Sequence, residues 1–152
     1  MDRVGGICKD KMAPHERVGA LMMGQTPDRV PFNPFAMGFS SLNCGYTIES
    51  FYNDPQKSLE AQLRTAEQYG YEPVLLLGYA AYGGWEFGGE VKMPTSEWEG
   101  APSVARHPVE SEEDLEKLEL PDVKTAGIIP ISMEFSKLCD QMGLPILPGT
   151  SV

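Results

Sequence analysis

The amino-acid sequence predicts an α/β fold with a parallel sheet, on three observations. Predicted strands and helices alternate along the chain. The second predicted strand is a short, continuous apolar run, as in a strand covered on both faces. Only three parallel strands are predicted in the 152 residues, whereas a (β/α)₈ barrel needs eight strands and about 250 residues. We therefore expect the opening part of a larger, closed barrel.

The first predicted elements are a helix, a strand and a loop. The helix begins near Pro14, a residue suited to a first helical turn, and ends at Gly24. One apolar face is formed at i, i+3, i+4 spacing by Val18, Leu21 and Met22. A strand is expected over 29–35, where two prolines place it at an edge, an end or a bulge. Residues 36–46 have little periodicity and are expected to form a loop.

The second helix has clear signals at both ends. Asp54 is a suitable N-cap, a proline follows it at the first helical position, and Gly70 ends the helix. The expected buried face is formed by Leu59, Leu63 and Ala66. The apolar strand predicted over 72–79 follows directly.

The remaining segments are predicted as a hairpin, two helices and a strand. Glycines and aromatics followed by alternating residues predict an extended hairpin arm over about 80–108. The pair Ser111 and Asp114 has the spacing of a capping box and opens a short acidic helix. The last helix is expected over about 127–142, before a strand that begins at 144.

Composition and charge exclude several classes of protein. The chain has 22 acidic and 12 basic side chains, a net charge of −10, which argues against nucleic-acid binding. No apolar run has the length of a membrane span, and residues 1–14 contain no apolar core of a signal peptide. Three widely spaced cysteines do not suggest a disulfide framework. We expect a cytoplasmic protein with no membrane partner, whose acidic stretch 97–122 is a solvated surface or, alternatively, a docking surface.

Few residues suggest reactive chemistry, and the residues alone assign no catalytic or metal-binding side chain. No Cys-x-x-Cys, His-x-Cys or HExxH pattern is present. Aromatic residues after the second strand, where α/β folds bind ligands, form a flexible lip that walls a flat ligand or simply packs on the body. These aromatic residues are Tyr79, Tyr82, Trp85 and Phe87. Glu86 among them is a possible acid/base or polar handle, although an exposed carboxylate is the simpler interpretation.

Several motifs together resemble the uroporphyrinogen decarboxylase superfamily. The main one is the run Glu16-Arg17-Val18, followed by Gly24-Gln25-Thr26-Pro27-Asp28-Arg29-Val30-Pro31. Further matching stretches are 66–71, 106–109, 113–114, 120–122 and 145–147. The superfamily contains decarboxylases and cobalamin-dependent methyltransferases that act on coenzyme M and related acceptors. The resemblance implies that residues 14–152 are the N-terminal portion of a single, incomplete TIM-barrel domain, preceded by a flexible segment 1–13.

Departures from the decarboxylase pattern favour the methyltransferase branch. Decarboxylases of the superfamily grip substrate carboxylates with two arginines, and Ala36 and Ser40 occupy those positions here. The decarboxylase aspartate at the end of the second strand, aligned near Gly78, is also missing. For full-length members the resemblance implies zinc and a corrinoid carried by a partner protein. Those zinc ligands lie beyond Val152, so we expect no cofactor within this chain and no activity of the chain alone.

On this interpretation the chain supplies one wall of the substrate cleft. The candidate substrate-binding residues are Asn33, Met37, Tyr79, Tyr82, Trp85 and Glu86. Two alternatives remain open. One is uroporphyrinogen decarboxylase activity itself. The other is a non-catalytic binding module derived from this fold, which associates with itself through open sheet edges.

Overall fold

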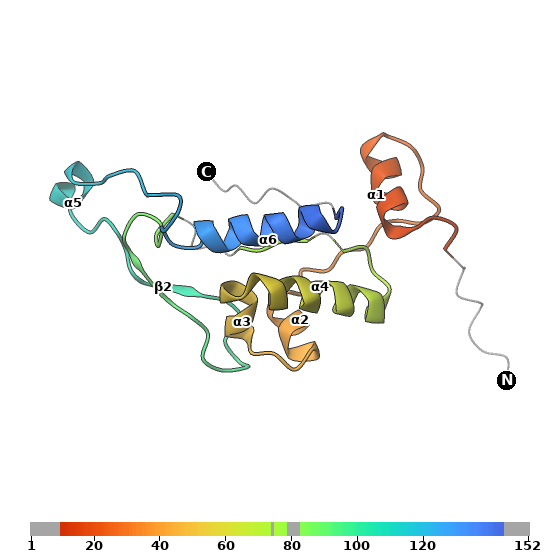
Figure 1. The fold of residues 1–152 in the computed structure, drawn as a ribbon, viewed down its shortest axis with the longest axis horizontal. Coiled ribbons are helices and arrows are strands. Elements are labelled where there is room, and N and C mark those ends of the chain that lie inside the picture. Colours follow the sequence, from red (N-terminus) through yellow and green to blue (C-terminus); the bar gives the residue numbers. More distant parts are fainter. Residues whose placement is uncertain (1–9, 74, 79–82, 145–152) are drawn as a thin grey trace.

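The structure, a computed structural model, describes residues 10–73, 75–78 and 83–144 and combines helices with one small sheet (Figure 1). In chain order its elements are α1 (Pro14–Met22), α2 (Met37–Asn43), α3 (Ile48–Asn53), α4 (Pro55–Tyr69), β1 (Glu90–Lys92), β2 (Ser103–Arg106), α5 (Glu112–Glu116) and α6 (Ile129–Gln141). Helix α4 is central, with α6 on one side and α2 and α3 on the other, while α1 and α5 lie at opposite ends (Figure 1). Across these described ranges, no helix combines the length and apolar character needed to cross a membrane.

Both predicted ends of α4 and the predicted start of α5 are confirmed in atomic detail. The Asp54 carboxylate accepts a hydrogen bond from the backbone N–H of Lys57 at 3.0 Å, as an N-cap does. At the other end Gly70 adopts the left-handed conformation with φ of 70°. The Ser111 hydroxyl likewise accepts from the Asp114 N–H at 3.2 Å. Helices α1 and α6 are also confirmed, within two residues of their expected limits.

The prediction of a loop over 36–46 was wrong, because this stretch contains helix α2. No side chain caps its N-terminus, so the sequence carries no start signal. The helix is stabilised by packing against α3 and α4. A Cβ atom on Gly38 would lie 3.1 Å from Cγ2 of Ile48, which shows how closely α2 and α3 approach. The sequence also missed α3, which is only six residues long and therefore too short for a clear period.

Neither 29–35 nor the described part of 72–79 forms a regular strand, so those two predictions were wrong for the residues described. The segments meet where the Glu72 N–H donates to the carbonyl of Phe32 at 3.0 Å. Further along the chain, the side chain of Gln62 makes the two backbone hydrogen bonds to Leu76 that a neighbouring strand would otherwise make. Its Nε2 donates to the Leu76 carbonyl at 2.9 Å, and its Oε1 accepts from the Leu76 N–H at 3.0 Å.

An antiparallel pair of short strands lies within the segment expected to form an arm. Strands β1 and β2 contain three and four residues, and Val91 faces Val104 in their register. The register shifts between Glu90 and Val91. The last predicted strand, apart from its first residue Leu144, lies outside the described residues.

Two apolar clusters form the core, and Ile131 of α6 packs against both. One contains Ile48, Phe51, Tyr52 and Ile128, with Met37, Trp85, Val91, Met93 and Ile131 packed against it. The other contains Leu59, Leu75, Leu77, Phe135 and Cys139, with Leu63, Ile131, Leu138 and Leu144 around it. The predicted buried face of α4 is therefore confirmed, with Leu59 and Ala66 buried and Leu63 partly buried.

Helix α1 buries a different face from the one its apolar spacing suggested. Leu21 and Met22 are 55% and 85% exposed. The helix instead buries Ala20 and the whole side chain of Arg17. This face lies inward because the Arg17 guanidinium is held in an ion-pair network, described below, with carboxylates from other segments of the chain.

Candidate functional site

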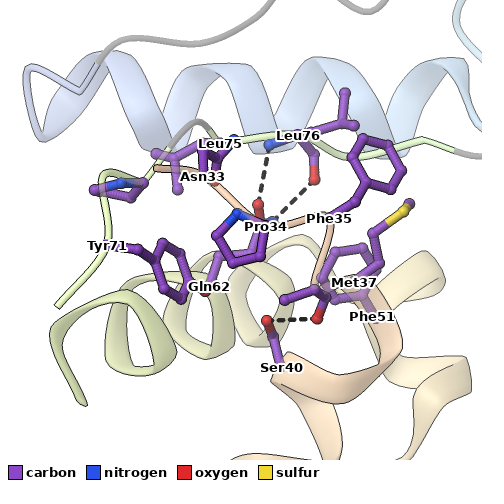
Figure 2. A pocket seen from close by; sticks show the side chains of 12 residues that line it. Asn33, Pro34, Phe35, Met37, Ser40, Phe51, Gln62, Tyr71, Leu75 and Leu76 are labelled. Carbon is purple, nitrogen blue, oxygen red and sulfur yellow. Dashed lines mark hydrogen bonds between the residues drawn. The ribbon is translucent and has the colours of Figure 1, made fainter. Parts of the chain in front are cut away.

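A well-defined cavity lies between α2, α4 and two connecting segments, the residues before α2 (33–36) and the residues after α4 (71–73 and 75–76) (Figure 2). Its volume is ≈ 50 Å³. The lining residues are Asn33, Pro34, Phe35, Ala36, Met37, Ser40, Phe51, Gln62, Tyr71, Pro73, Leu75 and Leu76. One water needs roughly 10–15 Å³ of such space, whereas organic ligands occupy about 300–1,000 Å³. The cavity therefore accommodates a few water molecules and not a whole organic substrate.

The lining of this cavity is neutral, since none of its twelve residues carries a charged side chain. The Ser40 hydroxyl donates to the Ala36 carbonyl at 2.7 Å, and the Gln62 amide is engaged by Leu76, as Figure 2 shows. Burial raises the pKa of the Tyr71 hydroxyl, which the neighbouring Ser40 partly offsets. The cavity therefore presents aromatic carbon and neutral hydrogen-bonding groups, which suit an apolar or uncharged group rather than a carboxylate.

Two of the predicted site residues, Asn33 and Met37, lie together in this wall. Met37 also packs against the apolar cluster that Trp85 covers, so the structure brings Met37 and Trp85 to the same cluster. The aromatic candidates Tyr79 and Tyr82 lie outside the described residues. The assignment of these positions to substrate binding stays a prediction.

Glu86 was expected to be an exposed carboxylate, and that expectation was wrong, since the residue is only 8% exposed. Its Oε2 accepts from the Gly83 N–H at 2.7 Å, and its Oε1 accepts from the Ile128 N–H at 3.2 Å. The same residue borders a broad surface hollow of ≈ 330 Å³ between residues 86–87 and α5. Its role as a polar handle for substrate stays a prediction.

The glycine-rich stretch around Glu86 is a compact hydrogen-bonded turn, which does not fit the expected flexible lip. The Gly89 N–H donates to the Gly84 carbonyl at 2.8 Å. The guanidinium of Arg106 donates to the Gly88 carbonyl, also at 2.8 Å. A Cβ atom on Gly89 would lie 2.5 Å from the Gly84 carbonyl oxygen, so this position requires glycine. We name residues 83–89 the glycine-rich turn.

Sequence reasoning missed a buried ion-pair network centred on Arg17. The side chain of Arg17 is fully buried, and its Nη1 lies 2.5 Å from Oε1 of Glu72, which is 1% exposed. The Arg17 Nε lies 2.6 Å from Oδ1 of Asp28. Arg29 pairs with Glu72 at 2.6 Å and with Asp10 at 2.9 Å. The network joins α1 to the segments around residues 28 and 72.

Electrostatics within the network keep every member charged. Hydrogen bonding to Arg17 holds the pKa of Asp28 far below its usual range, although burial opposes this. Burial alone raises the pKa of Glu72, but the N–H of Phe32 and both arginines lower it overall. Each carboxylate is already paired, so the network is suited to holding the chain in place rather than to proton transfer. The charged residues 17, 28 and 29 all lie in the motif that carries the family resemblance, but their partner at 72 lies too far along the chain to be read from that motif.

The described residues do not fit a zinc site. Within residues 10–73, 75–78 and 83–144, no group of three or more His, Cys, Asp or Glu side chains is arranged to hold a metal ion. Cys44 is half-buried, with its Sγ 3.9 Å from the carbonyl of Ala61. Cys139 is buried in the core, and burial raises its pKa to about 11. The zinc implied by the family resemblance is therefore not assigned to this part of the chain.

Comparison with known proteins gives one match. The family model described as uroporphyrinogen decarboxylase (URO-D) matches residues 13–145. Neither the curated proteins nor the solved structures include a match to this sequence.

Proposed function

Because the chain belongs to the uroporphyrinogen decarboxylase family, we propose that it forms the N-terminal portion of a (β/α)₈ barrel in a methyltransferase of that family. The proposed reaction moves a methyl group from a corrinoid carried by a partner protein to a thiol acceptor. The resemblance implies these partners, and the chain's own residues supply part of the cleft wall.

The observation that carries this proposal is the neutral wall at Ala36 and Ser40. In decarboxylases of the superfamily, two arginines at these positions grip the substrate's carboxylates. Bidentate arginine–carboxylate pairs are among the strongest polar contacts in proteins, and a polycarboxylate bound without them leaves its charges unpaired. Here the hydroxyl of Ser40 is turned onto the carbonyl of Ala36, and the surrounding wall holds no charged side chain.

In the proposed cleft, Met37 and Trp85 exclude water and Asn33 offers an amide that orients a polar group. A methyl group in transfer needs a site free of competing water, and an apolar wall supplies that condition. The described residues hold no set of zinc ligands, so the proposal derives no thiol activation from them. As part of the proposal, we expect this chain alone not to catalyse methyl transfer.

Two measurements on the purified protein test the proposal. The first is a fluorescence titration with uroporphyrin, an octacarboxylate, for which we expect no saturable binding. The second mixes the protein with the separately expressed C-terminal portion of a family methyltransferase and follows thiol-dependent demethylation of methylcobalamin. We expect demethylation in the mixture and none with either part alone. Micromolar uroporphyrin binding together with decarboxylation of uroporphyrinogen would overturn the proposal and favour the decarboxylase alternative.

A non-catalytic, self-associating module is a second candidate, favoured by apolar exposure on the segment before α2. Val30, Phe32 and Phe35 are 84%, 62% and 79% exposed, and exposed apolar patches often mark association surfaces. Size-exclusion chromatography with light scattering separates the two candidates. A compact dimer that shows no demethylation in the mixing experiment favours the module.

A further inference from the structure

We infer that Glu86 is a positioning residue whose carboxylate fastens the glycine-rich turn to the start of α6 and thereby sets where Trp85 lies. The hydrogen bonds that Glu86 makes do not depend on which reaction the protein catalyses. Its relevance to substrate rests on the proposed function, in which Trp85 forms part of the cleft wall. The inference gives Glu86 a role different from the acid/base or substrate handle that its sequence position suggested.

The two oxygens of Glu86 serve different parts of the chain. Oε2 accepts from the N–H of Gly83 within the turn, at 2.7 Å, and Oε1 accepts from the N–H of Ile128, which is 42 residues away, at 3.2 Å. Ile128 is the N-cap residue of α6. Amide groups at a helix N-terminus lack partners within the helix, so the carboxylate satisfies one of them and complements the positive end of the helix dipole.

The backbone of Gly127 is shaped to let the carboxylate approach. Gly127 has a φ of +52°, in the left-handed region that favours glycine. A Cβ atom at this position would lie 2.8 Å from Oε1 of Glu86 and 2.9 Å from its backbone nitrogen. Both distances are well below normal contact, so any larger residue at 127 pushes the turn and the start of α6 apart.

Trp85 is the side chain whose position depends most directly on this bridge. It precedes Glu86 in the turn and packs against the cluster formed by Ile48, Phe51, Tyr52 and Ile128. Ile128 therefore takes part in both arrangements, through its N–H on Glu86 and through its side chain in the cluster against which Trp85 packs. Loss of the bridge frees the turn to move relative to that cluster.

The arrangement also explains why a carboxylate is needed rather than an amide. A carboxylate accepts through both oxygens, whereas glutamine has one acceptor and one donor group. Glutamine at 86 keeps the shape of the side chain but leaves one of the two N–H groups facing an NH₂. The two N–H donors therefore require glutamate at position 86. If the side chain served only for packing, glutamine would replace it without effect.

The test uses Glu86→Gln, Glu86→Ala and Gly127→Ala in a Trp98→Phe background, where Trp85 is the remaining tryptophan. Amide hydrogen exchange is followed by NMR. In Glu86→Ala we expect exchange at least tenfold faster at both Gly83 and Ile128, with a red-shifted Trp85 emission. In Glu86→Gln we expect faster exchange at one of the two amides, and in Gly127→Ala at both.

The matched control is Glu90→Gln, which removes a nearby carboxylate that is 66% exposed and pairs with Arg106. We expect it to leave the exchange of both amides and the Trp85 emission unchanged. Should Glu86→Ala fail to fold, the isosteric Glu86→Gln carries the test. Unchanged exchange and emission in the Glu86 variants, or an equal effect in Glu90→Gln, overturns the inference. None of these readouts requires substrate, so failure here is separate from failure of the proposed methyl transfer.

Discussion

Replacing Glu72 by glutamine tests whether the buried ion-pair network holds the N-terminal part of the fold together. Glu72 is 1% exposed and contacts both Arg17 and Arg29, so glutamine leaves a buried guanidinium short of negative charge. Removing one partner of a buried pair costs about 3–5 kcal/mol. We expect the lower end, about 3 kcal/mol, because Asp28 still neutralises Arg17 and glutamine still accepts from the N–H of Phe32.

The measurement is urea unfolding followed by far-UV circular dichroism. With a slope of about 2 kcal/mol per molar urea, a loss of about 3 kcal/mol lowers the midpoint by about 1.5 M. That loss is a large share of the roughly 5–15 kcal/mol that stabilises a typical domain, so destabilisation should also be visible on heating.

The matched control is Glu113→Gln on α5. Glu113 lies 2.5 Å from Lys117, the same separation as between Glu72 and Arg17, but these two side chains are 75% and 66% exposed. Exposed pairs of this kind contribute little to stability, so we expect an unchanged midpoint. Equal shifts in the two variants, or no shift in Glu72→Gln, would show that burial does not determine the contribution of the network.

Three further predictions concern single side chains. Gln62→Leu removes both hydrogen bonds to Leu76 and leaves an extended backbone segment free to pair with another chain; we expect a higher apparent mass by light scattering, and an unchanged mass would contradict this role. Burial raises the pKa of Tyr52 to about 12, so its contribution to stability is full below about pH 10 and is lost as pH rises toward 12. Tyr52→Phe should flatten this alkaline loss in thermal unfolding. With a pKa of about 11, Cys139 should react with Ellman's reagent at pH 8 at least about a hundredfold more slowly than after unfolding in urea, and equal rates would refute its burial.

Helix ends could be predicted from the sequence where the signal is local. Asp54 and Ser111 cap the N–H groups three residues ahead of them, and Gly70 ends its helix, so each signal and its effect lie within one turn. Helix α2 has no such cap and depends on packing against α3 and α4. That packing brings together residues distant in sequence, which a local pattern does not report.

The candidate site could be predicted only in part, for the same reason. Asn33 and Met37 were expected in one wall, and both line the same cavity. The burial of Glu86 depends on an amide 42 residues away, and the pairing of Arg17 depends on a carboxylate 55 residues away. Apolar spacing on α1 favoured the wrong face because it does not weigh a buried charge against two aliphatic side chains.

The position of the ion-pair network limits what family membership says about the reaction that a protein catalyses. Arg17, Asp28 and Arg29 belong to the motif that makes the chain resemble its relatives, yet their task is architectural. Positions 36 and 40, on which the proposed function rests, lie outside that network. An ancestor could therefore have exchanged one reaction for another while its scaffold kept the same signature. The residues of the network indicate the family, whereas the residues that line the cavity are the ones to examine for the reaction.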